Sequence, residues 1–132
     1  MRKESAKFLT KIEDVPKIAA EIGKIKSVKA VYLFGSHATG KSNELSDIDI
    51  CIVGDLNEKE RLDVLKHSYD NLDISFFEDL PLVIQFRILR DGKPLFARED
   101  AFLRELKLRT IREYLDYSSF YRQFCRRAIE NV

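Results

Sequence analysis

The sequence is poor in the residues that stabilise small secreted proteins or mark membrane spans. Its 132 residues include no tryptophan, two cysteines, three prolines and five glycines. Cys51 and Cys125 are too few for a disulfide framework, so we expect a reducing, cytoplasmic location. No apolar run approaches the roughly 18 residues that a membrane-spanning helix needs. The N-terminal segment also lacks the apolar stretch of a signal peptide, so we expect neither a secreted protein nor a membrane protein.

What the sequence does contain is a globular composition with unevenly distributed charge. Apolar residues make up 45% of the chain, charged residues 34%, and the net charge is +1. This composition predicts one ordered, soluble domain. Residues 31–97 carry twelve acidic and seven basic side chains, whereas basic residues are in excess on both sides of them. An acidic middle segment fits either a cation site or a solvated surface, and it argues against direct nucleic-acid binding.

The hydrophobic pattern changes between the periods of strands and helices, which predicts an α/β protein with a mixed sheet. Runs of β-branched and aromatic residues predict strands at 30–34, 47–53, 72–77 and 93–97. Apolar steps of three and four residues predict helices at 14–25, 56–67 and 80–89 and from about residue 100 to the end, with a short further candidate at 4–12. We therefore expect a small sheet flanked by helices, with its acidic face open as a cleft.

Specific apolar residues carry the helical pattern in the first two of these helices. They are Ile18, Ile22 and Ile25, which lie on one face of the first helix, and Leu62 and Leu65 in the second.

The last part of the chain predicts a helical arm rather than a second domain. We divide the chain into a domain at 1–97 and a C-terminal arm at 98–132. One stripe of the arm contains Leu103, Leu106, Thr110 and Tyr114, and aromatic residues continue beyond it. Because these stripes are broad, the arm packs either on the domain or on a partner, which includes a second copy of the chain.

Two aspartates at the start of strand 47–53 are the most informative residues. Asp47 and Asp49 are two apart, so on a strand both side chains point to one face, with Cα atoms roughly 6.6 Å apart. Adjacent carboxylates repel each other unless a hard divalent cation lies between them. Asp73 alternates with apolar residues in strand 72–77, and it joins the same face if the two strands are neighbours. Three carboxylates can hold two Mg²⁺ ions about 3.5–4 Å apart for attack at phosphorus. The alternative for each aspartate is a solvated strand residue.

The loop 35–46 follows the predicted strand 30–34 and is rich in glycine, serine and threonine. Gly35 lets the backbone approach a phosphate closely, and Ser36 offers a hydroxyl and an N–H group. Lys41 is a further candidate for a phosphate contact. A Gly-Ser pair, ten intervening residues and then Asp-x-Asp at the opening of a strand form a more specific pattern than either pair alone.

The segment GSHATGKSNELSDIDI at 35–50 resembles the Gly-Ser … Asp-x-Asp motif of the DNA polymerase β-like nucleotidyltransferase superfamily. The short chain and its tail are similar to the minimal nucleotidyltransferase (MNT) branch, the antitoxins paired with HEPN-domain toxins. The matching residues are Gly35, Ser36, Gly40, Ser46, Asp47, Asp49 and Asp73. Many relatives carry arginine where this chain has Thr39 and often a second basic residue where it has Asn43, and Lys41 is the candidate substitute.

The resemblance implies a nucleotidyltransferase fold and an Mg²⁺-dependent reaction that uses ATP. It assigns Asp47, Asp49 and Asp73 to two Mg²⁺ ions and to catalysis, with Asp73 helping to deprotonate the attacking hydroxyl. It assigns Gly35 and Ser36 to the phosphates of the nucleotide. AMP is then expected to pass to a tyrosine hydroxyl of a cognate HEPN ribonuclease toxin, with release of pyrophosphate, and this AMPylation would silence the toxin.

Two other interpretations stay open from the sequence. One is an antitoxin that blocks its toxin by binding alone and keeps a vestigial site. The other is a P-loop, because residues 35–42 also satisfy G-x-x-x-x-G-K-[ST] after a strand. A P-loop needs a helix that begins near Gly40, and only about one turn fits before the strand at Asp47.

Overall fold

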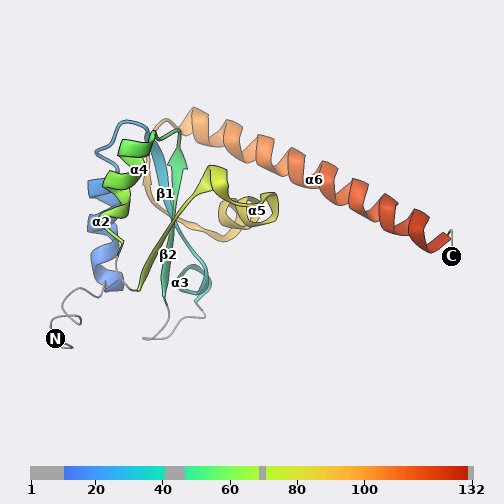
Figure 1. The fold of residues 1–132 in the computed structure, drawn as a ribbon, viewed down its shortest axis with the longest axis horizontal. Coiled ribbons are helices and arrows are strands. Elements are labelled where there is room, and N and C mark those ends of the chain that lie inside the picture. Colours follow the sequence, from blue (N-terminus) through green and yellow to red (C-terminus); the bar gives the residue numbers. More distant parts are fainter. Residues whose placement is uncertain (1–10, 41–46, 69–70, 131–132) are drawn as a thin grey trace.

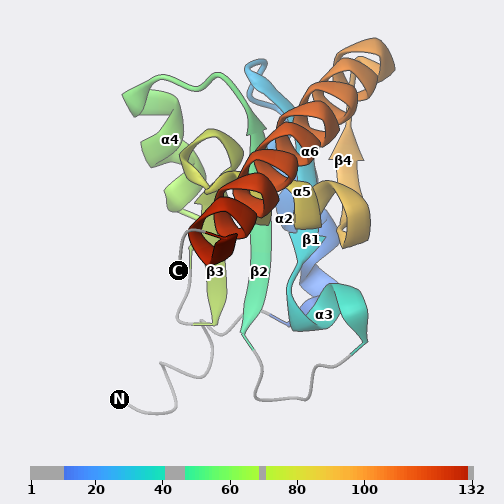
Figure 2. The same cartoon turned by 90° about the vertical axis from the view of Figure 1, so that its right-hand side faces the viewer.

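The computed structural model describes residues 11–40, 47–68 and 71–130. Within them four strands form one sheet in the order β3-β2-β1-β4, with helices on both faces (Figures 1 and 2). The strands are Val28–Phe34 (β1), Ile48–Gly54 (β2), Leu72–Phe76 (β3) and Lys93–Ala97 (β4). The helices are Val15–Ile22 (α2), Ser36–Thr39 (α3), Glu58–Leu65 (α4), Leu82–Asp91 (α5) and Asp100–Glu130 (α6), with short 3₁₀ turns at Ile12–Asp14 (η1) and Phe77–Asp79 (η2). This confirms the predicted mixed α/β fold.

The sheet is mixed because only one of its strand pairs is parallel. β1 pairs with β2 and with β4 in antiparallel register, and β2 pairs with β3 in parallel register. A parallel pair needs a crossover connection, and α4 lies in the connection between β2 and β3. All four predicted strands are present, and β3 ends one residue early because η2 begins at Phe77.

Alternation along β2 sends its side chains into two apolar layers. Ile50 and Ile52 pack with residues of α2 and α4, whereas Cys51 and Val53 pack with residues of α5 and α6. Figure 1 shows these two helix pairs on opposite sides of the sheet. The prediction that the acidic face is open is therefore wrong for most of its length, because α5 and the first half of α6 cover it from Cys51 onward.

The predicted apolar face of the first helix is confirmed, although the helix ends earlier than expected. α2 buries Val15, Ala19 and Ile22 and ends before Ile25, and Ile18 and Ile25 are partly buried against the same core. The candidate helix at 4–12 lies almost entirely outside the described residues.

The second helix, α4, begins at a capping box. The Asn57 side chain accepts the backbone N–H of Glu60, and the Glu60 side chain accepts the backbone N–H of Asn57. Val64 is the buried residue of the helix and packs in the core, whereas Leu62 and Leu65 are exposed. The helix is therefore present as predicted, but the two leucines that indicated it do not face the core.

The arm is one continuous helix of 31 residues, α6. Leu103, Leu106 and Thr110 are buried against the domain, and Tyr114 stacks on Phe86 of α5 with ring centroids 4.0 Å apart. Beyond this stack α6 runs away from the domain (Figure 1). In the part of the chain that the structure describes, no helix has both the length and the apolar character needed to cross a bilayer.

Candidate active site

The three aspartates singled out from the sequence lie at one end of the sheet. Asp49 in β2 pairs with Asp73 in β3 in the parallel register, and Asp47 lies just before β2. Asp49 is half-buried, whereas Asp47 and Asp73 are exposed. β2 and β3 begin at this end, and β1 ends there and continues into α3 (Figure 2). The condition that the two aspartate-bearing strands are neighbours is therefore met.

Burial and like charge act together on Asp49. Partial removal from water is the main cause that raises the pKa of its carboxyl, and the negative charges of Asp73 and Asp47 raise it further. His37 in α3 lowers this pKa and so opposes the other effects. Ionisation of Asp49 is therefore less favourable than that of a carboxyl in water, and a cation bound beside it would stabilise the ionised form.

The turn between β1 and α3 is built around the Asp49 carboxylate. Gly35 has φ 75° and ψ −152°, a backbone conformation that residues with a side chain rarely adopt. A Cβ atom at Gly35 would also overlap the carboxylate of Asp49. Phe34, the preceding residue, pairs with Asp49 across the β1–β2 ladder. Glycine is thus required both by the backbone conformation and by the lack of space for a Cβ atom. Its presence lets the backbone at the start of α3 lie close to Asp49.

The donor set fits Mg²⁺ in chemical type. Carboxylate oxygens are its preferred protein ligands, and Mg²⁺ is commonly held by one or two carboxylates together with water and substrate phosphates. Among the described residues, no three His, Cys, Asp or Glu side chains form a group that could hold a metal ion by themselves. Oxygens of water and of a substrate phosphate would therefore be needed to complete the coordination of Mg²⁺ here. Asp49 and its exposed neighbours Asp47 and Asp73 are the residues that would hold it.

A cavity of about 250 Å³ adjoins the Gly35 turn on the same side of the sheet. One wall comes from the end of β1 and from α3, and the other comes from α5. The lining residues are Phe34, Gly35, Ala38, Thr39, Ile84, Arg87, Ile88, Asp91 and Gly92. No residue of α5 was predicted from the sequence to belong to the site. The signal that could have found it is the i, i+3, i+4, i+7 spacing of Ile84, Arg87, Ile88 and Asp91, which places two charged residues beside an apolar helix face.

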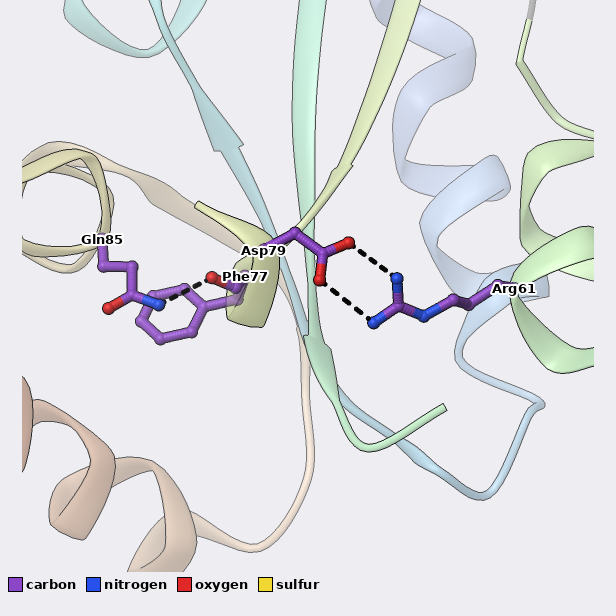
Figure 3. A network of polar contacts seen from close by, with 4 residues as sticks. All are labelled: Arg61, Phe77, Asp79 and Gln85. Atoms are coloured by element: carbon purple, nitrogen blue, oxygen red, sulfur yellow. Dashed lines mark hydrogen bonds and ion pairs between the residues drawn. The ribbon is translucent and has the colours of Figure 1, made fainter. Parts of the chain in front are cut away.

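Polar contacts hold the beginning of α5 in place (Figure 3). The Gln85 side chain donates a hydrogen bond from Nε2 to the backbone oxygen of Phe77 at 2.7 Å. Asp79, two residues after Phe77 in η2, accepts two hydrogen bonds from Arg61 of α4, at 2.6 and 3.4 Å. The Arg61 guanidinium also lies over the ring of Phe76, 4.6 Å from its centroid. These contacts join α4, the end of β3 and α5, and so position the α5 wall of the cavity.

Part of the predicted phosphate loop, including Lys41, Asn43 and Ser46, lies outside the described residues. The described part contradicts the P-loop interpretation. A P-loop helix begins at the second glycine of the motif, but α3 ends there, with Gly40 as its left-handed C-cap. The single helical turn between the two glycines belongs to the Gly-Ser … Asp-x-Asp pattern instead.

Comparisons with known proteins agree with this geometry. Residues 16–101 match the family described as Polymerase beta, Nucleotidyltransferase. The chain is also similar to a Methanocaldococcus jannaschii protein named as a protein adenylyltransferase, with 36% identity over 75 residues. The aligned residues are 57% of this chain and 61% of that relative, so the chain spans less than two thirds of its length.

Two solved structures share the fold at low sequence identity. A toxin–antitoxin structure with AMP-PNP has a TM-score of 0.68 at 18% identity, covering 86% of this chain and 98% of that one. A structure of the tri-AMPylated Shewanella oneidensis HEPN toxin in complex with MNT antitoxin has a TM-score of 0.60 at 18% identity, covering 89% and 94%. At this identity the likeness shows the fold alone. The family match, in contrast, spans more than half of the chain and contains the Gly35 turn and all three aspartates, so the chain belongs to the Polymerase beta nucleotidyltransferase family.

Proposed function

We propose that this protein is an Mg²⁺-dependent antitoxin that transfers AMP from ATP to a tyrosine hydroxyl of a HEPN ribonuclease toxin. The observation that carries the proposal is the pairing of Asp49 with Asp73 directly behind the Gly35 turn. Membership of the nucleotidyltransferase family supports nucleotidyl transfer. The name of the Methanocaldococcus relative supports AMP as the transferred group, and the AMPylated HEPN toxin of the Shewanella complex supports the acceptor.

The proposed reaction is one in-line displacement at the α-phosphorus. The tyrosine oxygen forms a bond to that phosphorus, the bond from phosphorus to the bridging oxygen breaks, and pyrophosphate leaves with the electron pair. Asp73 takes the proton of the hydroxyl, and Gly35, Ser36 and Lys41 bind the phosphates. Two Mg²⁺ ions bound by the three aspartates would offset the negative charge on the phosphate oxygens.

The second half of α6 is the proposed contact with the toxin. Its large side chains point into solvent: Tyr117, Phe120, Tyr121, Phe124 and Ile129 are all more than half exposed. Exposed aromatic residues in such number are typical of interaction surfaces. The same feature favours a second candidate function, an antitoxin that acts by binding alone, and it also permits pairing of two copies of this chain.

The position of the label in ATP tests the proposed reaction. The purified protein is incubated with its toxin, Mg²⁺ and ATP labelled at either the α- or the γ-phosphate. Label from the α-position that becomes fixed on the toxin is the expected result, and mapping of the peptide should locate it on a tyrosine. Transfer of label from the γ-position alone would contradict the proposal.

The double variant Asp47→Asn/Asp49→Asn separates the two candidate functions. It should lose transfer while still folding and still binding the toxin. Toxin activity in cells is the second readout. If the variant still neutralised the toxin in full, binding rather than AMPylation would be the mechanism.

A further inference from the structure

We infer that Arg87 of α5 binds the β- and γ-phosphates of the nucleotide across the cavity between α5 and α3. The inference rests on the proposed nucleotidyl transfer and assigns a substrate-binding residue outside the Gly-Ser … Asp-x-Asp segment.

The position of Gly35 connects the cavity to the aspartates. Its Cα faces the Asp49 carboxylate, and the same residue lines the cavity. A triphosphate whose α-phosphorus lies at the aspartates and whose chain passes Gly35 therefore extends into this cavity. Thr39 lines the wall that α3 contributes, and Arg87 lines the opposite wall. The phosphates at the far end of the chain would thus lie between a hydroxyl and a guanidinium.

The charge of Arg87 is available for an anion. Among the described residues Arg87 makes no hydrogen bond or ion pair within bonding distance, although its positive charge is one of the effects that lower the pKa of the Asp91 carboxyl. The nearby carboxylate of Asp91 is already held by Arg90, which donates to both of its oxygens at 2.9 and 2.7 Å. A triphosphate beside three aspartates needs positive charge along its length, and a guanidinium matches the geometry of phosphate oxygens.

The backbone that carries Arg87 is fixed while its side chain is exposed. Ile88, the next residue, is buried in the core, and Gln85 fastens the start of α5 to Phe77. Arg87 can therefore reach the phosphates by rotation of its side chain alone. Because negative charge grows on pyrophosphate as it leaves, the same contact should assist the displacement as well as binding.

Nucleotide binding to the full chain tests the inference without any transfer. The probes are AMP and the α,β-methylene analogue of ATP, which cannot release AMP, each titrated calorimetrically in the presence of Mg²⁺. Arg87→Gln should weaken binding of the analogue about tenfold to a hundredfold, the usual value of a hydrogen bond to a charged group. Affinity for AMP should stay unchanged, because AMP lacks the β- and γ-phosphates.

Matched variants separate this role from a general effect of charge or folding. Arg104→Gln removes the same charge from an exposed position at the start of α6 and should leave both affinities unchanged. Thr39→Arg, added to Arg87→Gln, places a guanidinium on the opposite wall of the same cavity and should recover most of the lost affinity for the analogue.

Each outcome bears directly on the inference. Equal affinity of Arg87→Gln and the native protein for the analogue would overturn it, and so would an equal loss for the analogue and AMP. If the native protein binds the analogue through Arg87 but transfers no α-label to the toxin, the proposed function fails while this assignment stands.

Discussion

At the scale of single residues, the chemistry of the site depends on how unfavourable the charge on Asp49 is. Its carboxyl is half-buried and faces two like charges, and these effects raise its pKa. Such an arrangement lowers the free energy of unfolding of the metal-free protein and favours binding of a cation. The residues of the site would therefore bind Mg²⁺ and nucleotide at some cost to folding stability.

Asp49→Asn should therefore stabilise the metal-free protein while abolishing transfer. The folded-state pKa of Asp49 is raised, so its contribution to stability is fully present below the ordinary carboxyl value of 3.8 and is lost as pH rises through the raised value. In urea unfolding at increasing pH, the free energy of unfolding of the variant should rise relative to that of the native protein over that pH window. Above the window the difference between the two proteins should stay constant. A variant that is less stable than the native protein at neutral pH would contradict this account of Asp49.

Added Mg²⁺ should reverse this order. The native protein is expected to gain thermal stability with Mg²⁺ because the ion binds the folded state, and the Asp49→Asn variant should gain little. Loss of transfer in the variant should be roughly a hundredfold or more, as for removal of other groups that stabilise transition-state charge. The measurement is the melting temperature of both proteins in Ca²⁺-free buffer, with and without Mg²⁺.

At the scale of elements, the turn from β1 into α3 combines a backbone requirement with a steric one. Gly35 and Gly40 flank α3, and both have positive φ, 75° and 76°. Their surroundings differ, because a Cβ at Gly35 would meet Asp49, whereas a Cβ at Gly40 would meet no atom of the described residues within 4 Å. The two glycines therefore form a matched pair for experiment.

Gly35→Ala should destabilise the protein by about 1–3 kcal/mol and abolish transfer, because the new methyl group must displace Asp49. Gly40→Ala carries only the backbone cost of a left-handed residue, about 1–2 kcal/mol, and should keep transfer. Chemical unfolding and the labelled-ATP assay are run on both. Comparable transfer by the two variants would show that the approach of Gly35 to Asp49 has no part in the reaction.

β2 also determines the chemistry of one of the two cysteines. Cys51 is fully buried in the strand, and burial raises the pKa of its thiol to about 12. It therefore stays protonated and inaccessible, whereas Cys125 on α6 is partly exposed. Alkylation of the native protein should modify Cys125 alone, and alkylation in denaturant should modify both, as counted by mass spectrometry. Rapid modification of Cys51 under native conditions would indicate that α5 and α6 open readily from the sheet.

At the scale of the whole molecule, α6 has two halves with different roles. The first half closes the sheet face above Cys51, and the second half leaves the domain and carries the exposed aromatic residues. The domain boundary at residue 97 remains a prediction, and the buried residues of α6 show that the arm starts as part of the fold. Substitutions in the first half of α6 should therefore change the stability of the protein, and substitutions in the second half should change its binding to a partner.

Leu106→Ala and Phe124→Ala test this division. Leu106 is 5% exposed, so its truncation should cost about 2–5 kcal/mol of unfolding free energy. Phe124 is 62% exposed, so its truncation should change stability by about 0.5 kcal/mol or less while weakening the complex with the toxin. Denaturant unfolding and co-purification are the two readouts. A large loss of stability from Phe124→Ala would mean that the second half of α6 packs on another copy of the chain.

Local patterns allowed much of this protein to be predicted. Strand alternation placed Asp47 and Asp49 on one face and Cys51 among apolar neighbours, because side-chain direction along a strand depends only on the backbone repeat. The Gly-Ser pair and its distance from Asp-x-Asp indicated the family, because a motif and its spacing can be read along the chain without knowledge of the fold.

Only the tertiary structure decided how distant segments combine. The parallel pairing of β2 with β3 set Asp73 opposite Asp49, and the packing of α5 brought Arg87 to the cavity beside Gly35. The packing of α4 on the sheet buries Val64 and leaves Leu62 and Leu65 exposed. The sequence by itself determined the strands, the Gly-Ser turn and the local direction of the aspartates. Strand order, the cover over the acidic face and the second wall of the cavity depend on contacts between residues far apart in the chain, and no local repeat specifies those contacts.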